Sequence, residues 1–218
     1  MLIDLKLEGK IIIVVGGGLE AYRKTLSFVD SGAAIWVISK EFSEGIAGLA
    51  DAKKVALIKT EVKDSKTFVD SLNPKPDIFL AITDNEKLNL ELVKAAKKVG
   101  CMVYSVDNPA LSDFVLPAVA RIGEVKIAVS TSGKSPAMAR VLRERIEKMV
   151  TPEDLLEIEL QANVRGILKN RFSDPKERSR VLYEILNNDR IKEFLEEGNL
   201  LEAQELAMKI ICEKEDKN

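Results

Sequence analysis

Histidine is absent from this sequence of 218 residues. It is the side chain that proteins use most often as a general acid or base near neutral pH, and as a ligand for transition metals. Its absence excludes a metal site built on histidine, and we expect no resident metal ion. Any proton transfer must fall to carboxylate, lysine, tyrosine or cysteine side chains.

Cysteine and long apolar segments are also scarce. Cys101 and Cys212 are far apart in the chain, so they match no metal-binding spacing and no disulfide framework, and we interpret them as buried or incidental thiols. The N-terminal segment MLIDLKLEGK mixes acidic and apolar residues, which predicts neither a signal peptide nor a membrane span. We therefore expect a cytoplasmic protein with no membrane partner.

An excess of basic charge is missing as well. The net charge is −2 and the sequence pI is about 5.5. A protein that binds nucleic acid generally carries a basic excess, so we expect no nucleic-acid partner. The length suffices for one full domain and a smaller one.

The first half of the chain alternates short apolar runs with amphipathic segments. Five apolar runs predict strands, at 11–15, 33–39, 55–59, 77–83 and 101–106. Helices are predicted at 19–31, 43–51 and 85–100. Continuous apolar strands that alternate with helices predict an α/β fold with a Rossmann-like parallel sheet covered on both faces.

The pattern changes after residue 112. Two apolar runs flank Gly123 and Glu124 and predict a β-hairpin, and Ser135-Pro136 predicts the start of a helix. From Thr151 onward the chain is charged and helical. We therefore divide it into a Rossmann domain at 1–112, a hairpin-and-helix segment at 113–150 and a small all-α C-terminal domain at 151–218.

A glycine-rich turn follows the first predicted strand. Gly16, Gly18 and Ala21 match the G-x-G-x-x-A form of the dinucleotide fingerprint. The first glycine allows a tight turn, the second lets the backbone approach a pyrophosphate, and the small third residue lets the helix pack against the strand. The alternative is a glycine turn kept only for packing. Lys40 and Glu41 at the second strand leave NAD and NADP both open.

Asp107 comes directly after the fifth predicted strand. Ligands of such sheets bind at the carboxyl edge, where a carboxylate can meet a substrate beside the nicotinamide. The alternative role is a turn-capping aspartate before Asn-Pro. The spacing alone does not decide between the two.

Four segments together resemble one known family: GGGLEAYRK, AITDNEKLN, VDNPALSDFVLPA and STSGKSPAMARVLRERIE. They are similar to the precorrin-2 dehydrogenases of sirohaem synthesis, which include the N-terminal module of sirohaem synthase. The resemblance implies NAD-dependent oxidation of precorrin-2 to sirohydrochlorin. Some members also insert ferrous iron as a substrate. It further implies a homodimer in which segment 113–150 reaches across to the partner.

The resemblance also assigns roles to residues. Asp107 is the expected catalytic residue, for the oxidation and for iron insertion alike. The expected cofactor-binding residues are Gly16, Gly17, Gly18, Leu19, Glu20, Lys40, Glu41, Thr83 and Asp84. Tyr104 and Ser105 depart from the N-V-V-D motif of the family, which puts the detailed lining of the pocket in doubt.

Precorrin-2 carries many carboxylates, so its pocket should be locally basic even in an acidic protein. The expected substrate-binding residues are Arg121, Ser132, Lys134 and Arg140. For each basic residue the alternative is a solvated helix or strand face, and for Ser132 it is ordinary capping. A non-catalytic NAD(H)-sensing module is the competing function. Such a sensor would need the glycine turn, but neither Asp107 nor the S-P-x-x-A-R helix start.

Overall fold

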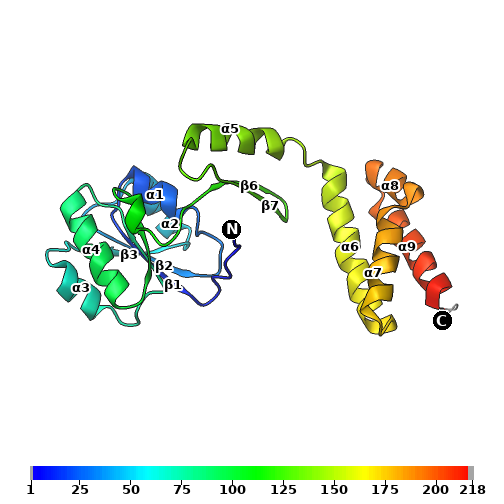
Figure 1. The fold of residues 1–218 in the computed structure, drawn as a ribbon, viewed down its shortest axis with the longest axis horizontal. Helices are drawn as coiled ribbons and strands as arrows, with labels where there is room; N and C mark the ends of the chain where they lie inside the picture. The colour runs from blue at the N-terminus through cyan, green and yellow to red at the C-terminus, as the bar shows by residue number, and fades with distance from the viewer. Residues whose placement is uncertain (1, 216–218) are drawn as a thin grey trace. The chain divides into compact units, whose positions relative to one another are not determined.

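A computed structural model describes residues 2–215 of the chain. The chain divides into two compact units, with the boundary between Leu116 and Pro117 (Figure 1). Among the residues described, no helix is both long and apolar enough to cross a membrane.

The first unit is built on a five-stranded sheet in the order β3-β2-β1-β4-β5, with every pair parallel. In the register of the central strand, Ile13 pairs with Trp36 on one side and Phe79 on the other. The strands are β1 (Ile11–Val15), β2 (Ala34–Ser39), β3 (Ala56–Lys59), β4 (Ile78–Ala81) and β5 (Met102–Ser105). The predicted Rossmann-like parallel sheet is confirmed.

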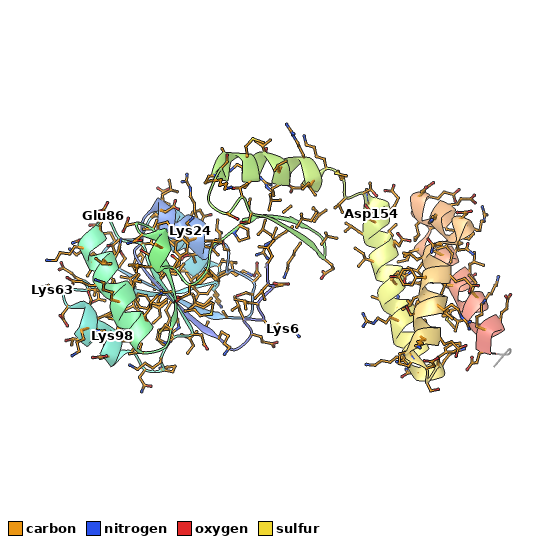
Figure 2. All side chains as sticks on the ribbon, viewed as in Figure 1. Lys6, Lys24, Lys63, Glu86, Lys98 and Asp154 are labelled. Atoms are coloured by element: carbon orange, nitrogen blue, oxygen red, sulfur yellow. The ribbon has the colours of Figure 1, made fainter. Side chains whose placement is uncertain are left out.

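Helices cover both faces of this sheet because successive strand residues point to opposite sides. On β1, Ile12 and Val14 pack with α1 (Leu19–Thr25) and α2 (Glu44–Asp51). The alternate residues, Ile13 and Val15, pack with α3 (Ser65–Ser71) and α4 (Glu86–Lys98). Charged side chains such as Glu86 and Lys98 project outward from α4 (Figure 2).

The first helix is shorter than the one predicted over 19–31, because α1 ends at Thr25. Beyond it, the N–H groups of Ser27 and Phe28 bond to carbonyls three residues back, which is a tighter winding than an α-helix. Asp30 then has a φ of 63°, a left-handed conformation that no helix continues through. The pattern over 19–31 therefore came from a helix plus a turn whose phenylalanine is buried.

The sequence analysis missed α3. This helix is short, and only Ser65 and Val69 of its residues are buried, so it presents almost no apolar stripe. Its start is fixed by Asp64, whose side chain accepts a hydrogen bond of 2.6 Å from the Thr67 N–H. A polar helix of this kind depends on its cap rather than on periodicity.

The second unit begins with the predicted hairpin. Strands β6 (Ala118–Ile122) and β7 (Val125–Val129) are antiparallel, joined by a turn in which Gly123 has a φ of 54°. Helix α5 (Pro136–Glu147) packs on both strands and begins at Ser135, whose hydroxyl accepts from the Met138 N–H. The helix thus starts at Ser135-Pro136, as predicted.

Four further helices share a separate apolar core within this unit, which includes Leu160, Val181, Ile191 and Ala207. They are α6 (Pro152–Arg171), α7 (Pro175–Leu186), α8 (Asp189–Glu196) and α9 (Leu200–Glu215). Helix α6 starts with a capping box, in which Thr151 and Asp154 exchange side-chain and backbone hydrogen bonds. The three-part division at residues 112 and 150 stays a prediction.

Candidate functional site

A cavity of about 980 Å³ opens at the carboxyl edge of the parallel sheet. The chain runs from β1 to β2 on one side and crosses to β4 on the other, so β1 and β4 form the switch point where such folds bind ligands. The cavity gathers every residue predicted in this unit: Gly16, Gly17, Gly18, Leu19, Glu20, Lys40, Glu41, Thr83, Asp84 and Asp107.

The three glycines of the turn have different surroundings. A Cβ at Gly16 would lie 2.0 Å from the Ile82 carbonyl oxygen, and the φ of 130° already disfavours any side chain. A Cβ at Gly17 would lie 2.0 Å from the Glu41 carbonyl oxygen. These two positions are glycine because neighbouring backbone passes too close for a side chain.

Gly18 differs from its two neighbours. A Cβ there would meet no protein atom within 4 Å, and the φ of −81° suits any residue. The protein itself therefore gives no reason for a glycine at this position. The close approach of a ligand to the protein backbone would give such a reason. This is the role that the fingerprint assigns to the second glycine. The open cradle at Gly18 and the cavity beside it fit a dinucleotide.

Lys40, at the end of β2, is paired with Glu61 just beyond β3, at a distance of 2.7 Å. The hydrogen bond and charge of Glu61 raise the pKa of Lys40, and Asp84 and Glu41 add to the effect. In return, the hydrogen bond from Lys40 lowers the pKa of Glu61. Sequence analysis missed Glu61, because the contact depends on the register between β2 and β3.

The cavity is lined by carboxylates. Among the residues that the structure describes, its charged lining residues are one lysine, Lys40, and five acids: Glu20, Glu41, Glu61, Asp84 and Asp107. Such a lining gives the cavity a negative potential. It therefore disfavours additional anionic groups, such as an extra phosphate on a dinucleotide or the carboxylates of a tetrapyrrole.

Asp107 is exposed on the cavity wall and is held by Asn89 of α4. The Asn89 Nδ2 donates to Asp107 Oδ2 at 2.6 Å. The turn after β5 is capped by another residue, since the Ser105 hydroxyl accepts from the Asn108 N–H at 3.2 Å. Because Ser105 caps this turn, Asp107 does not serve as its cap, and the Asp107 carboxylate lies at the cavity.

Asn89 is the second residue that sequence analysis missed. It is completely buried on the face of α4 that also carries Leu92, Val93 and Ala96. A buried amide among apolar residues is costly unless it is hydrogen-bonded, which is the signal that the sequence offered. It was present as an asparagine at an apolar position of the predicted helix over 85–100.

The two departures from the family motif lie off the cavity wall. Tyr104 packs on the other side of the sheet against Phe114, with ring centroids 5.9 Å apart. The ammonium of Lys24 lies 5.4 Å from the centre of the Tyr104 ring. Partial burial lowers the pKa of Lys24, but its contacts with Tyr104 and Glu20 outweigh this and leave it raised.

The other four predicted residues belong to the second unit. Arg121 is on β6, and Arg140 is an exposed residue of α5. Ser132 and Lys134 lie in the loop that leads into α5, where Ser132 has a φ of 53° and the Lys134 N–H bonds to the Thr131 carbonyl at 3.0 Å. Ser132 is thus held in a left-handed conformation that is rare for residues other than glycine, asparagine and aspartate.

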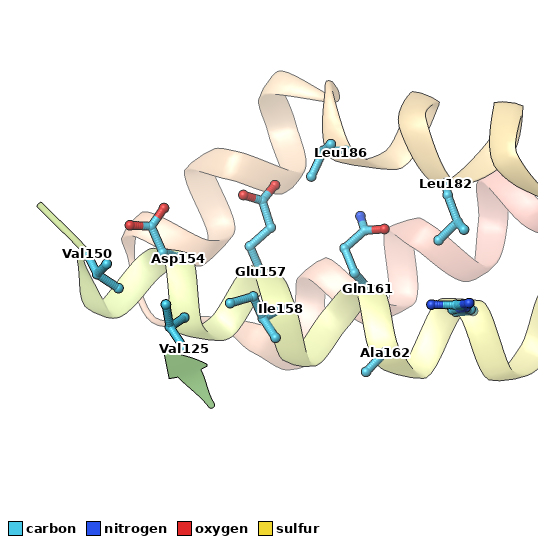
Figure 3. A pocket seen from close by; sticks show the side chains of 10 residues that line it. Val125, Val150, Asp154, Glu157, Ile158, Gln161, Ala162, Leu182 and Leu186 are labelled. Carbon is cyan, nitrogen blue, oxygen red and sulfur yellow. The ribbon is translucent and has the colours of Figure 1, made fainter. Parts of the chain in front are cut away.

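The second unit has a pocket of its own, of about 630 Å³, along α6 and α7 (Figure 3). Glu157 and Gln161 project from α6 toward the side where Leu186 lies. Partial burial raises the pKa of Glu157. None of the predicted site residues lines this pocket. In the part of the chain that is described, no three His, Cys, Asp or Glu residues gather as a metal site.

Comparison with known proteins identifies the first unit. A family model described as putative NAD(P)-binding matches residues 3–118, more than half of the chain. The chain belongs to this family. A second family model, described as sirohaem biosynthesis protein central, matches residues 123–149, which contain β7 and α5. Membership of the NAD(P)-binding family confirms the predicted nicotinamide cofactor.

Individual relatives agree with the two models. Siroheme synthase 1 of Aeromonas salmonicida is 29% identical over 210 residues, which cover 96% of this chain and 43% of that protein. Siroheme synthase 2 of Yersinia pseudotuberculosis is 30% identical over 201 residues, which cover 92% of this chain and 41% of that protein. The chain thus spans less than half the length of these relatives.

A solved structure shares the fold over nearly the whole chain. It is that of SirC, a precorrin-2 dehydrogenase, with a TM-score of 0.74 and 22% sequence identity, covering 96% of this chain and 99% of that one. These relatives and this structure are the kinds of protein that the four sequence motifs resemble, and the structural likeness confirms the predicted fold.

Proposed function

We propose that this protein oxidises precorrin-2 to sirohydrochlorin with NAD in sirohaem synthesis. One observation carries the proposal: an exposed carboxylate, Asp107, lies in the same cavity as the glycine turn of an NAD(P)-binding protein. The names of the siroheme synthase relatives and of SirC supply the substrate. A sensor module would need the cavity but would have no use for a buried amide that holds this carboxylate.

In this proposal the bound nicotinamide supplies the hydride acceptor. Asp107 takes the proton that the substrate loses in the same oxidation and later releases it to solvent, so that two electrons and two hydrogens leave precorrin-2. Gly18 would admit the pyrophosphate, and Thr83 and Asp84, which follow β4, would border the bound cofactor. With no histidine in the chain, the general base falls to a carboxylate of the cavity, and we assign it to Asp107, which the buried Asn89 holds in place.

The proposal favours NAD over NADP for an electrostatic reason. The extra phosphate of NADP would sit near the end of β2, where Lys40 is the basic residue. Lys40 is engaged by Glu61 at 2.7 Å, and Glu41 lies next to it in the chain. The lysine charge is therefore already balanced, and an additional phosphate would meet carboxylates.

The substrate carboxylates require basic groups that the acidic cavity does not provide. We assign this role to Arg121, Lys134 and Arg140, with the Ser132 hydroxyl as a hydrogen-bond donor. Guanidinium groups bind carboxylates through paired hydrogen bonds. These residues all lie on or between β6 and α5, the segment that the sirohaem biosynthesis model matches in large part.

The same segment supports a homodimer. Val119 of β6 is 40% exposed, and Met138 and Val141 of α5 are 45% and 36% exposed. Exposed apolar side chains on one short segment fit a surface that another chain covers. The proposal also includes a cytoplasmic location and ferrous iron as a second substrate, held by the macrocycle while Asp107 accepts its protons.

The test measures NADH formation with precorrin-2 under anaerobic conditions, for the wild type and for Asp107→Asn. We expect turnover with NAD and a loss of about 100-fold or more in kcat for the variant, because general-base catalysis contributes that much. NAD affinity, measured by calorimetry, should stay near the wild-type value. Tight NAD binding without turnover by the wild type would overturn the proposal in favour of a sensor.

A further inference from the structure

The Asn89 side chain uses all of its hydrogen-bonding capacity. Its Oδ1 accepts from the Thr83 N–H at 2.9 Å and from the Thr83 hydroxyl at 2.7 Å. Its Nδ2 donates to the Thr83 carbonyl at 2.9 Å and to Asp107 Oδ2 at 2.6 Å. The side chain is completely buried, so water does not compete for these bonds.

Two of these bonds fix which way the amide faces. A backbone N–H can only donate, and a backbone carbonyl can only accept. Because both groups of Thr83 face the amide, its oxygen must point to the Thr83 N–H and its nitrogen to the Thr83 carbonyl. The second Nδ2 hydrogen then has one direction left, toward Asp107.

This arrangement makes the two oxygens of Asp107 unequal. Oδ2 already accepts an N–H bond at 2.6 Å, which occupies one of its lone pairs and makes it less basic than Oδ1. Oδ1 has no such partner from Asn89. Asp107 itself is exposed on the cavity wall, so Oδ1 is the oxygen that a ligand can reach.

We propose that Asn89 is a positioning residue that locks Asp107 in place and makes Oδ1 the oxygen that receives the substrate proton. The inference rests on the proposed function, because it assigns geometry to the base of that reaction. It also links the two halves of the site. Thr83 borders the cofactor side of the cavity, and the same amide sets both Thr83 and Asp107.

Asn89→Asp is the sharpest test, since it keeps the shape and both acceptor bonds from Thr83. It replaces the nitrogen that donates to Asp107 and to the Thr83 carbonyl by a second carboxyl oxygen, and two carboxylates this close share a proton. We expect NAD affinity within about 3-fold of wild type, a fall in kcat of about 10-fold or more at neutral pH with KM for precorrin-2 little changed, and an acidic limb of the kcat profile that moves upward by about one pH unit.

Asn85→Asp is the matched control. Asn85 lies one helical turn earlier and caps α4 by accepting from the Leu88 N–H at 3.0 Å, a bond that aspartate makes equally well. It adds the same charge near the same edge of the sheet but removes no donor from Asp107. Its kcat profile should move by much less than that of Asn89→Asp. An equal shift in the two variants would overturn the proposal.

Asn89→Ser provides a second variant without added charge. Serine is too short to reach Asp107, so kcat should fall as in Asn89→Asp. The acidic limb should move less than in Asn89→Asp, because one hydrogen bond is lost and no carboxylate is added. If both variants lose NAD binding and unfold at lower temperature, Asn89 is structural only and the proposal is overturned. Wild-type kcat in either well-folded variant overturns it too. If Asp107→Asn itself keeps full turnover, the proposed function fails first, which separates the two failures.

Discussion

Three consecutive glycines form one turn, and the space around each of them is different. Gly16 and Gly17 are excluded from bearing side chains by carbonyl oxygens of the protein, each 2.0 Å from where a Cβ would be. Gly18 faces open space. The same residue type therefore serves folding at two positions and ligand access at the third.

This difference predicts opposite outcomes for two alanine substitutions. Gly16→Ala should lower the free energy of unfolding by about 3 kcal/mol or more, because it combines a left-handed φ with a backbone clash. Gly18→Ala should leave stability within about 0.5 kcal/mol of wild type. It should nevertheless weaken NAD binding by at least about 10-fold, because the methyl group occupies the space through which the pyrophosphate approaches.

Urea unfolding and calorimetric NAD titration of both variants check this prediction. The two measurements serve as controls for each other, since each variant should move mainly one of them. Wild-type NAD affinity in Gly18→Ala would show that the third glycine is kept for a reason other than the dinucleotide.

At the scale of elements, β5 is tied to α4 through one carboxylate. Asp113 accepts from the Val103 N–H of β5 at 2.9 Å, and Lys97 of α4 is 2.7 Å from its other oxygen. The hydrogen bond from Lys97 and the bond from Val103 lower the pKa of Asp113. This lowering makes the stability of the first unit depend on pH.

We predict that Asp113→Asn lowers the free energy of unfolding by about 0.5–1 kcal/mol at pH 7, since the pair is partly exposed and screened. The folded pKa lies below the unfolded value of about 3.9, so the wild-type advantage is present above that pH and is lost as the pH falls through the lowered pKa. Urea unfolding of both proteins at neutral pH and near pH 3 tests it. Asp70→Asn, at an exposed position of α3, is the control; an advantage that persists in acid would contradict the prediction.

Elements with a continuous apolar run or a clear helical stripe were predictable from sequence. The strands at β1 and β4 are almost wholly buried, and α4 carries an apolar stripe with a cap at each end. Helix α3 was missed because a capping aspartate, rather than a stripe, defines it. Helix α1 was overextended because the following turn also buries an apolar residue, Phe28.

Parts of the candidate site that lie in one turn or at one strand end were predictable in the same way. The glycines and Asp107 could be placed because the fingerprint and the carboxyl edge are local to the chain. Glu61 and Asn89 could not, because their partners lie 21 and 18 residues away and are reached only through strand register and helix packing. Sequence patterns do not predict contacts between residues that are far apart in the chain.

At the scale of the whole molecule, the chain consists of two units with separate cores. The first unit carries the sheet and glycine turn of a dinucleotide fold, and the second carries the basic residues that we assign to the substrate. The roles of Arg121, Ser132, Lys134 and Arg140 stay predictions, since they depend on where a polyanionic substrate lies and not on any local pattern.

The acidic lining of the cavity has a consequence for how the protein responds to its ionic surroundings. NAD is an anion, and five carboxylates face it across a cavity that has a single lysine among the described residues. The Debye length falls from about 30 Å at 0.01 M salt to about 8 Å at 0.15 M, so added potassium chloride screens this repulsion. Calorimetric titrations should therefore show NAD binding more tightly as salt rises, whereas the KM for precorrin-2, which depends on attraction to arginine and lysine, should increase. A weakening of NAD binding over the same range would contradict the prediction. Under the proposed function, added salt would therefore favour the cofactor and disfavour the substrate, because the charges around the two ligands differ in sign.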